Sequence, residues 1–239
     1  MDVSRLIPLL CAGLLISEAS PAAEPMALGG ISLSKTRVIF APSTKAQTFA
    51  VSNSGKQSYL IQSRVQRTPD DTTQAPFIVV PPLFRLQPDS LQQIRIVSQG
   101  AMLPKDRESL FYLSVLAIPA GSEQRVQPMQ VSMGIRFVLK LFYRPSGLVS
   151  LSQCSLRFHR VAQGVKVENP TPYFQTLGNL AFNHNPVNLD KQPAMLAPQS
   201  EQIYPVSAKE RDVNWQTVTD YGGLSPSCQQ RLISQQNMP

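Results

Sequence analysis

The residue types that usually catalyse reactions are scarce and scattered in this sequence. The chain has 2 histidines, His159 and His184, and neither is spaced from another histidine or a cysteine as zinc ligands are. No G-x-S-x-G, H-E-x-x-H or phosphate-binding glycine run is present. We therefore interpret both histidines as surface or structural residues, and we predict no catalytic site, no metal site and no cofactor.

The N-terminal segment has the pattern of an export signal. Arg5 gives a charged start, an apolar run covers residues 6–16, and the small residues of SEASPAA follow. Because the run is too short for a stable membrane anchor, we predict a signal peptide over residues 1–23. The alternative is an uncleaved anchor or a buried N-terminal helix. No later segment is apolar enough to predict a membrane span.

The charge balance is basic but dispersed. Removal of residues 1–23 takes away Asp2, Arg5 and Glu18, which raises the formal net charge from +7 to +8. The lysines and arginines form no basic run, and an exported protein rarely meets nucleic acid. We therefore predict no nucleic-acid partner.

Two of the 3 cysteines remain after removal of the signal, because Cys11 lies within it. An even number of cysteines in an oxidising compartment predicts that Cys154 and Cys228 pair. The alternative is two separate buried thiols.

One long segment, QPMQVSMGIRFVLKLFYRP at 127–145, has apolar residues at every second position. They are Met129, Val131, Met133, Ile135, Phe137 and Leu139. Side chains on a strand alternate between its two faces, so the segment predicts one long strand with an apolar stripe. The stripe either fills the core of its own domain or is offered to a partner.

Other short alternating segments, bounded by turn residues, recur along the chain. Ahead of the striped strand they cover 31–40, 46–55, 58–67, 77–88, 90–99 and 108–119. Pro81 and Pro82 interrupt the fourth of them, which predicts an edge or crossover piece. A turn-like stretch at 143–147 then precedes a second strand-rich set. This pattern predicts an all-β protein with two immunoglobulin-like sandwich domains, over residues 24–145 and 146–239.

Four segments together resemble the periplasmic pilus-assembly chaperones of the chaperone–usher pathway. They are LPKDRESLFYLSVLAIPA (103–120), KLFYRP (140–145), VENPTPYF (167–174) and TDYGG (219–223). The resemblance runs over nearly the whole mature chain. It implies two immunoglobulin-like domains in a boomerang, a periplasmic location, one-to-one complexes with pilus subunits, and delivery to an outer-membrane usher. The short segment after Pro119 resembles the short-loop subgroup of these PapD-like chaperones.

The resemblance assigns the striped strand as the donor strand that completes the unfinished sandwich of a pilus subunit. A donated strand supplies main-chain hydrogen bonds, and its alternate side chains fill pockets in the subunit. The expected plugs are Met129, Val131, Met133, Ile135 and Phe137. The alternative is that these side chains pack in the core of the first domain. That alternative is favoured for Leu139, and for Phe137 both alternatives stay open.

Two cations match the pair that grips the subunit's terminal carboxylate in this family, Arg37 and Lys140. A carboxylate suits an arginine fork together with a lysine point charge. Strict alternation would place Arg37 on the face of Ile31 and Leu33, whereas Lys140 falls on the face opposite the apolar stripe. The alternative is that each is an ordinary solvated cation.

Glu108, Arg144 and Asp220 match family positions that form a salt-bridge network between the domains. Isolated surface ion pairs contribute little stability, so we expect this network to set the orientation of the domains.

Two other classes of protein were weighed against the chaperone. A structural or adhesive surface protein built from similar sandwiches is the main alternative, and a secreted hydrolase is the second. An apolar edge strand invites self-association, so weak dimerisation of the empty protein is also expected. No stable insertion into a membrane is predicted.

Overall fold

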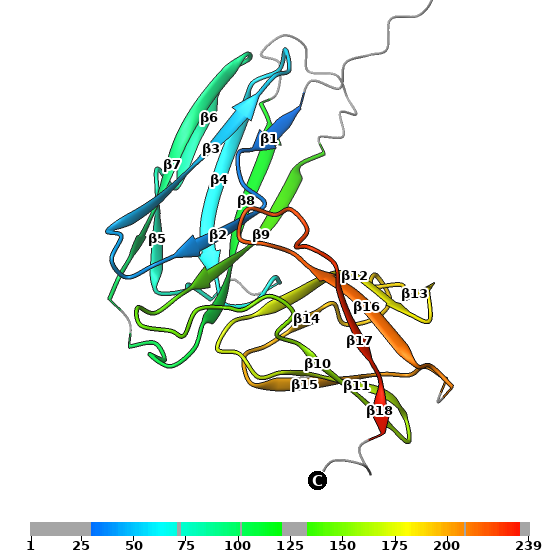
Figure 1. Ribbon diagram of the computed structural model, residues 1–239. Helices are drawn as coiled ribbons and strands as arrows, with labels where there is room; N and C mark the ends of the chain where they lie inside the picture. The colour runs from blue at the N-terminus through cyan, green and yellow to red at the C-terminus, as the bar shows by residue number, and fades with distance from the viewer. Residues whose placement is uncertain (1–29, 71–72, 101, 121–132, 208, 235–239) are drawn as a thin grey trace, which may run out of the picture.

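The computed structural model describes residues 30–70, 73–100, 102–120, 133–207 and 209–234, and the regular elements in these ranges are strands. The predicted signal peptide lies outside the described residues. Within them, no helix is long and apolar enough to cross a membrane. Two β-sandwiches meet at an angle (Figure 1), which confirms the predicted all-β architecture of two immunoglobulin-like domains in an L-shape.

Nine strands in the described ranges form the N-terminal domain. They are β1 (Ile31–Leu33), β2 (Arg37–Phe40), β3 (Ala46–Asn53), β4 (Tyr59–Gln66), β5 (Phe77–Val80), β6 (Leu83–Leu86), β7 (Ser90–Ser98), β8 (Ser109–Pro119) and β9 (Ile135–Tyr143). One sheet has the order β1-β3-β7-β5 and the other has the order β2-β9-β8-β4-β6. The two sheets face each other across one hydrophobic core.

Two of the predicted strand segments, 31–40 and 77–88, each cross from one sheet to the other. The 31–40 segment divides into β1, antiparallel to β3, and β2, parallel to β9. The crossing changes the phase of alternation, because Ile31 points inward in the first sheet whereas Val38 and Phe40 point inward in the second. The prediction that Arg37 shares a face with Ile31 was therefore wrong. The 77–88 segment crosses between β5 and β6, as the two prolines indicate.

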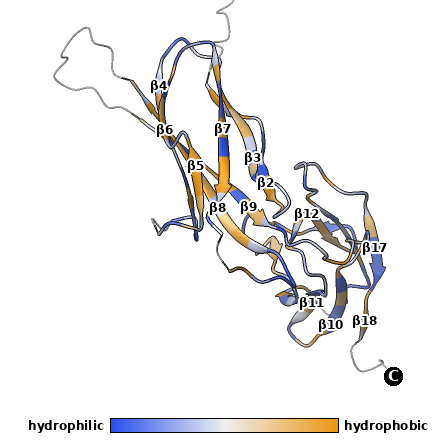
Figure 2. Ribbon diagram, turned by 90° about the vertical axis from the view of Figure 1, so that its left-hand side faces the viewer, coloured by the Kyte–Doolittle hydropathy of each residue, from blue (hydrophilic) through white to orange (hydrophobic). Residues whose placement is uncertain are grey.

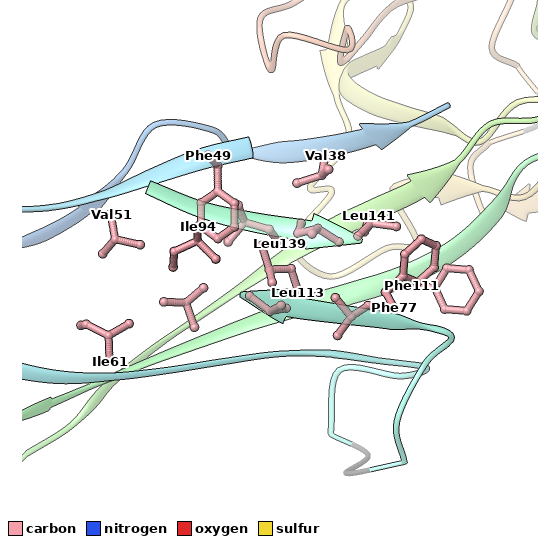
Figure 3. Packing of buried hydrophobic residues seen from close by; sticks show 14 of the residues in the cluster. Val38, Phe49, Val51, Ile61, Phe77, Ile94, Phe111, Leu113, Leu139 and Leu141 are labelled. Carbon is pink, nitrogen blue, oxygen red and sulfur yellow. The ribbon is translucent and has the colours of Figure 1, made fainter. Parts of the chain in front are cut away.

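The core of this domain is built from aliphatic and aromatic side chains of both sheets (Figure 3). Leu139 and Leu141 of β9 lie among them and are 6% and 0% exposed. Figure 2 shows that β5 and β8 are hydrophobic over most of their length. β8 is apolar on both faces, because Leu113 and Val115 are buried in the core whereas Ile118, on the opposite face, is 37% exposed.

The C-terminal domain holds the remaining strands of the described ranges. They are β10 (Arg157–Val161), β11 (Gly164–Asn169), β12 (Gln175–Phe182), β13 (Asn185–Pro186), β14 (Met195–Leu196), β15 (Ser200–Tyr204), β16 (Asp212–Thr217), β17 (Cys228–Arg231) and β18 (Ile233–Ser234). One sheet has the order β15-β11-β10-β18, and the other has the order β13-β12-β16-β17, with β14 also pairing with β12. A separate core fills this sandwich.

The predicted disulfide is present in this second domain. Cys154 and Cys228 are bonded, with their Cα atoms 5.5 Å apart, and they lie 74 residues apart in the sequence. Closing a loop of this length contributes about 4 kcal/mol in the chain-entropy model. The alternative of two separate thiols is thereby excluded.

Candidate functional site

The striped strand is shorter in the described residues than the pattern predicts. β9 begins at Ile135, and Met133 and Gly134 lie before it without strand pairing. Met129 and Val131, two of the expected plugs, lie outside the described residues.

Burial divides the stripe into two parts. Met133 is 79% exposed and Ile135 is 45% exposed, whereas Leu139 is buried. Phe137, between them, is partly buried against the core. The prediction that Leu139 belongs to the core of its own domain is confirmed. The N-terminal end of the stripe leaves its apolar side chains largely uncovered by the rest of the described chain.

β9 also has a free edge along the same residues. β8 pairs with β9 over its whole length, from Ile135 opposite Ala117 to Tyr143 opposite Ser109. On the other side β2 pairs only with residues 140–143. Among the described residues, no strand pairs with that side of residues 135–139. Unpaired backbone groups on an apolar edge are a template for another strand.

The two predicted anchor cations come together where this free edge ends. Arg37 is the first residue of β2, and its Cα pairs in register with that of Lys140 on β9. Both side chains lie on the outer face of the sheet, because Val38 and Leu141 beside them point into the core. Lys140 is also the cross-strand neighbour of Tyr112.

Neither of these two cations forms an ion pair with a carboxylate of the described residues. Within the described residues, neither Arg37 nor Lys140 has an acidic oxygen within the 4.0 Å of an ion pair. Burial lowers the pKa of Lys140, and the charge of Arg37 lowers it further. Burial also lowers the pKa of Arg37, although the charges of Asp220 and Glu108 act in the opposite direction. Two partly desolvated like charges, side by side, favour the binding of an anion.

Arg37 reaches across the domain boundary. Its Nη1 donates a hydrogen bond to the carbonyl oxygen of Val218 at 3.3 Å, and its guanidinium carbon lies 5.8 Å from the ring centre of Phe142. Its Nε is buried and has no hydrogen-bond partner among the described residues. The side chain lines a cavity of about 570 Å³ between the two domains. Arg37 therefore retains donor capacity for a ligand.

The three residues of the predicted interdomain network are also in contact. Arg144 donates from Nε to Glu108 Oε1 at 2.7 Å, and from Nη1 and Nη2 to the two carboxylate oxygens of Asp220 at 2.6 and 2.8 Å. The other oxygen of Glu108 accepts a hydrogen bond from the backbone N–H of Phe174 at 2.8 Å. Glu108 and Arg144 belong to the first domain and Asp220 and Phe174 to the second, so these bonds join the two.

The charge state of this network reflects its burial. Burial raises the pKa of Glu108, and the bonds from Arg144 and the Phe174 N–H counteract only part of that rise. Burial acts to lower the pKa of Arg144, but its bonds to Asp220 and Glu108 outweigh burial and raise it. The guanidinium is therefore firmly charged, and it is the centre of the network.

Two features of the interface carry a weaker signal in the sequence. Phe142 is 3% exposed on the outer face of β9, where its ring lies 5.6 Å from that of Phe174 in the second domain. The only sequence signal for this interface residue is that a large apolar side chain lies on the face opposite the apolar stripe. Tyr221 lies within the TDYGG segment and lines the cavity with Arg37, but the sequence pattern assigns it no role.

The arrangement of these described residues is suited to binding. An apolar strand edge leads to two cations that have no ion-pair partner among the described residues, and such an edge suits a chain that ends in a carboxylate. No cluster of potential metal ligands occurs in the part of the chain that the structure describes.

Comparisons with known proteins agree with this geometry. Residues 30–149 match the family described as the pili and flagellar-assembly chaperone PapD N-terminal domain, and residues 152–229 match the pili assembly chaperone PapD C-terminal domain. The probable fimbrial chaperone ElfD of Escherichia coli K12 is 37% identical over 204 residues, covering 83% of this chain and 85% of ElfD.

Two solved structures show the same fold at similar identity. A structure of the Salmonella enterica SafA pilin in complex with the SafB chaperone matches with a TM-score of 0.76 and 30% identity, covering 87% of this chain and 99% of the other. The E. coli chaperone DraB matches with a TM-score of 0.74 and 33% identity, covering 85% and 97%. With both domains matched in order, this chain belongs to the PapD family of pilus-assembly chaperones.

Proposed function

We propose that this chaperone binds, folds and caps pilus subunits by lending them the N-terminal part of β9, in a complex of one chaperone and one subunit. Members of the family act by binding and not by catalysis. The subunit gains the missing edge of its sandwich, and the chaperone keeps that edge from aggregating.

The observation that carries the proposal is the position of β2 relative to the free edge of β9. β2 runs parallel to β9 and begins at Arg37, opposite Lys140. A subunit strand laid parallel to β9 along residues 135–139 would lie in line with β2 and end where β2 begins. Its terminal carboxylate would then meet both cations, which fixes the register of the added strand.

The exposed side chains of the stripe supply the second part of the interaction. Met133, Ile135 and Phe137 occupy every second position, so their side chains share one side. Met129 and Val131 continue this spacing in the sequence. Each side chain that becomes buried in a subunit groove would contribute about 1.5–3 kcal/mol. Methionine is flexible, which suits a strand that must fit several different subunits.

The composition of residues 1–23 and the disulfide support the proposed cellular context. Residues 1–23 would act as a signal peptide, and the mature domains would cover 24–145 and 146–239. The Cys154–Cys228 bond suits the oxidising periplasm. There the loaded chaperone would meet an outer-membrane usher, and the empty one would mask its free edge by weak self-dimerisation.

The test is co-expression with the pilin-like subunits encoded beside this gene, followed by periplasmic pull-down. The wild-type chaperone is expected to bring down a smaller partner in equal amounts. Lys140→Ala is expected to lose that partner, and Lys56→Ala, which removes an exposed lysine outside the site, is expected to retain it. If no neighbouring subunit binds the wild type, the proposal that this chaperone caps those subunits fails.

A further inference from the structure

Tyr221 is the most exposed aromatic side chain among the described residues, at 99% of its full accessibility. An aromatic ring that contacts so little of its own protein contributes little to the stability of the fold. Tyrosine is enriched where proteins bind other proteins, because its ring offers a large contact area with few rotatable bonds.

The turn that carries Tyr221 is held firmly in place. The backbone N–H of Thr219 donates to the carbonyl of Gly223 at 2.8 Å, and that of Gly222 donates to the carbonyl of Thr219 at 3.0 Å. Asp220 accepts two hydrogen bonds from Arg144. The ring is therefore presented on a fixed backbone, which reduces the entropy lost when a partner binds.

This turn also touches the residue directly before Arg37. Gly222 has φ +87° and packs against Thr36 so closely that a Cβ atom at this position would clash with the Thr36 hydroxyl. Figure 1 shows the turn, in orange-red between β16 and β17, close to the start of β2. The second domain thus approaches the start of β2, where the proposed subunit strand would end.

Tyr221 and Arg37 share two cavities. Both line the interdomain cavity of about 570 Å³, and both line a second cavity of about 460 Å³ along the start of β2. Leu33 and Ile39 are apolar residues of the second cavity. Tyr221 therefore lines the same cavities as the cation that is proposed to hold the carboxylate, and its exposed ring is free to contact a ligand bound there.

We infer that Tyr221 contacts the side chain at the carboxyl end of the bound subunit strand and favours subunits that end in large apolar or aromatic residues. This inference rests on the proposed function, because it needs the subunit terminus at Arg37 and Lys140. It makes the second domain a direct participant in recognition, in addition to its role in shaping the cleft.

The experiment measures the affinity of the purified chaperone for a synthetic peptide that copies the last 16 or so residues of a co-encoded subunit, with a free carboxylate. Tyr221→Ala is expected to weaken binding about tenfold, as loss of an aromatic anchor does, and Tyr221→Phe is expected to keep wild-type affinity. Met102→Ala is the matched control, since Met102 is equally exposed and lines neither cavity. Replacing the last large side chain of the peptide by alanine should remove the difference between the wild type and Tyr221→Ala.

Thermal unfolding of the empty variants separates contact from structure. A contact role predicts the same Tm for Tyr221→Ala and the wild type. The inference is overturned if Tyr221→Ala binds as the wild type does while Lys140→Ala does not, an outcome that leaves the proposed function intact. It is also overturned if Tyr221→Ala lowers the Tm in step with its affinity. Failure of the wild type itself to bind peptide and subunit would instead count against the proposed function.

Discussion

At the scale of single residues, Lys140 stands in an environment that disfavours its own charge. It is partly buried, it is paired in register with Arg37, and no carboxylate among the described residues lies within ion-pair distance of it. A positive charge in such a place costs stability in the empty protein. The binding of a carboxylate would offset that cost, so stability and function oppose each other at this position.

We predict that Lys140→Met stabilises the empty chaperone while it abolishes subunit binding. At pH 7 the Tm should rise by about 2–4 °C, which corresponds to roughly 1 kcal/mol for a protein of this size. Thermal unfolding of the empty wild type and variant measures the shift, and pull-down measures the loss of the complex.

The pH dependence of that difference provides a second check. The pKa of Lys140 in the folded protein lies below its ordinary value of 10.5. The folded state therefore releases this proton at a lower pH than the unfolded state, and the wild type gains stability as the pH rises between the two values. The Tm difference should shrink toward pH 10.5. A difference that stays constant between pH 7 and pH 10 would contradict the assignment.

At the scale of elements, the apolar side chains of β9 and of the residues just before it lie in two different surroundings, one part in the core of the first domain and the other exposed to solvent. Leu139 and Leu141 complete the core of the first domain, whereas Met133 and Ile135 remain exposed. β2 covers the edge of the strand only from Lys140 onward. One strand is thus divided between a structural part and a binding part at the position of the anchor cation.

We predict that alanine substitutions on the two sides of this division affect different properties, the stability of the fold on one side and subunit binding on the other. Leu139→Ala should lower the free energy of unfolding by about 2–4 kcal/mol, because it opens a cavity in a packed core. Ile135→Ala should leave the unfolding of the empty protein within about 0.5 kcal/mol of the wild type and should weaken the subunit complex. Urea unfolding and pull-down of both variants distinguish the cases. An Ile135→Ala variant that binds normally but unfolds more easily would assign this residue to the core.

At the scale of the whole molecule, the Glu108–Arg144–Asp220 network joins two sandwiches that have separate cores. The Glu108 side chain is 2% exposed and that of Arg144 is 26% exposed. Removing the cation would leave a buried carboxylate without its ionic partner, which costs about 3 kcal/mol or more. The network also holds Asp220, and therefore the turn that approaches Arg37.

We predict that Arg144→Ala broadens the distribution of angles between the domains. Small-angle scattering of the empty protein should show a larger radius of gyration, and subunit binding should weaken because the second domain no longer closes the end of the cleft. Lys166→Ala is the control, since its ion pairs with Glu168 and Glu201 lie within one domain. Unchanged scattering for Arg144→Ala would show that the remaining contacts suffice to orient the domains.

The sequence alone determined the architecture because its signals are local. The period of two in apolar residues, the turn residues between segments and the even number of retained cysteines depend only on neighbours in the chain. The strands, the two sandwiches and the disulfide followed from them, and the resemblance to a family supplied the candidate anchor residues.

The tertiary structure decided the features that depend on contacts between distant segments. The crossing of residues 31–40 between sheets turned Arg37 outward, and only the parallel register of β2 and β9 placed it beside Lys140, 103 positions away in the numbering. The length of β2 and of the facing sheet determines the residue of β9 at which the apolar stripe stops packing in the core. The alternation of apolar residues alone cannot locate that residue. The angle between the two domains brings Gly222 close to Thr36 and thereby sets the position of Tyr221. The sequence does not predict this contact, because packing across the domain boundary leaves no periodic pattern in either segment.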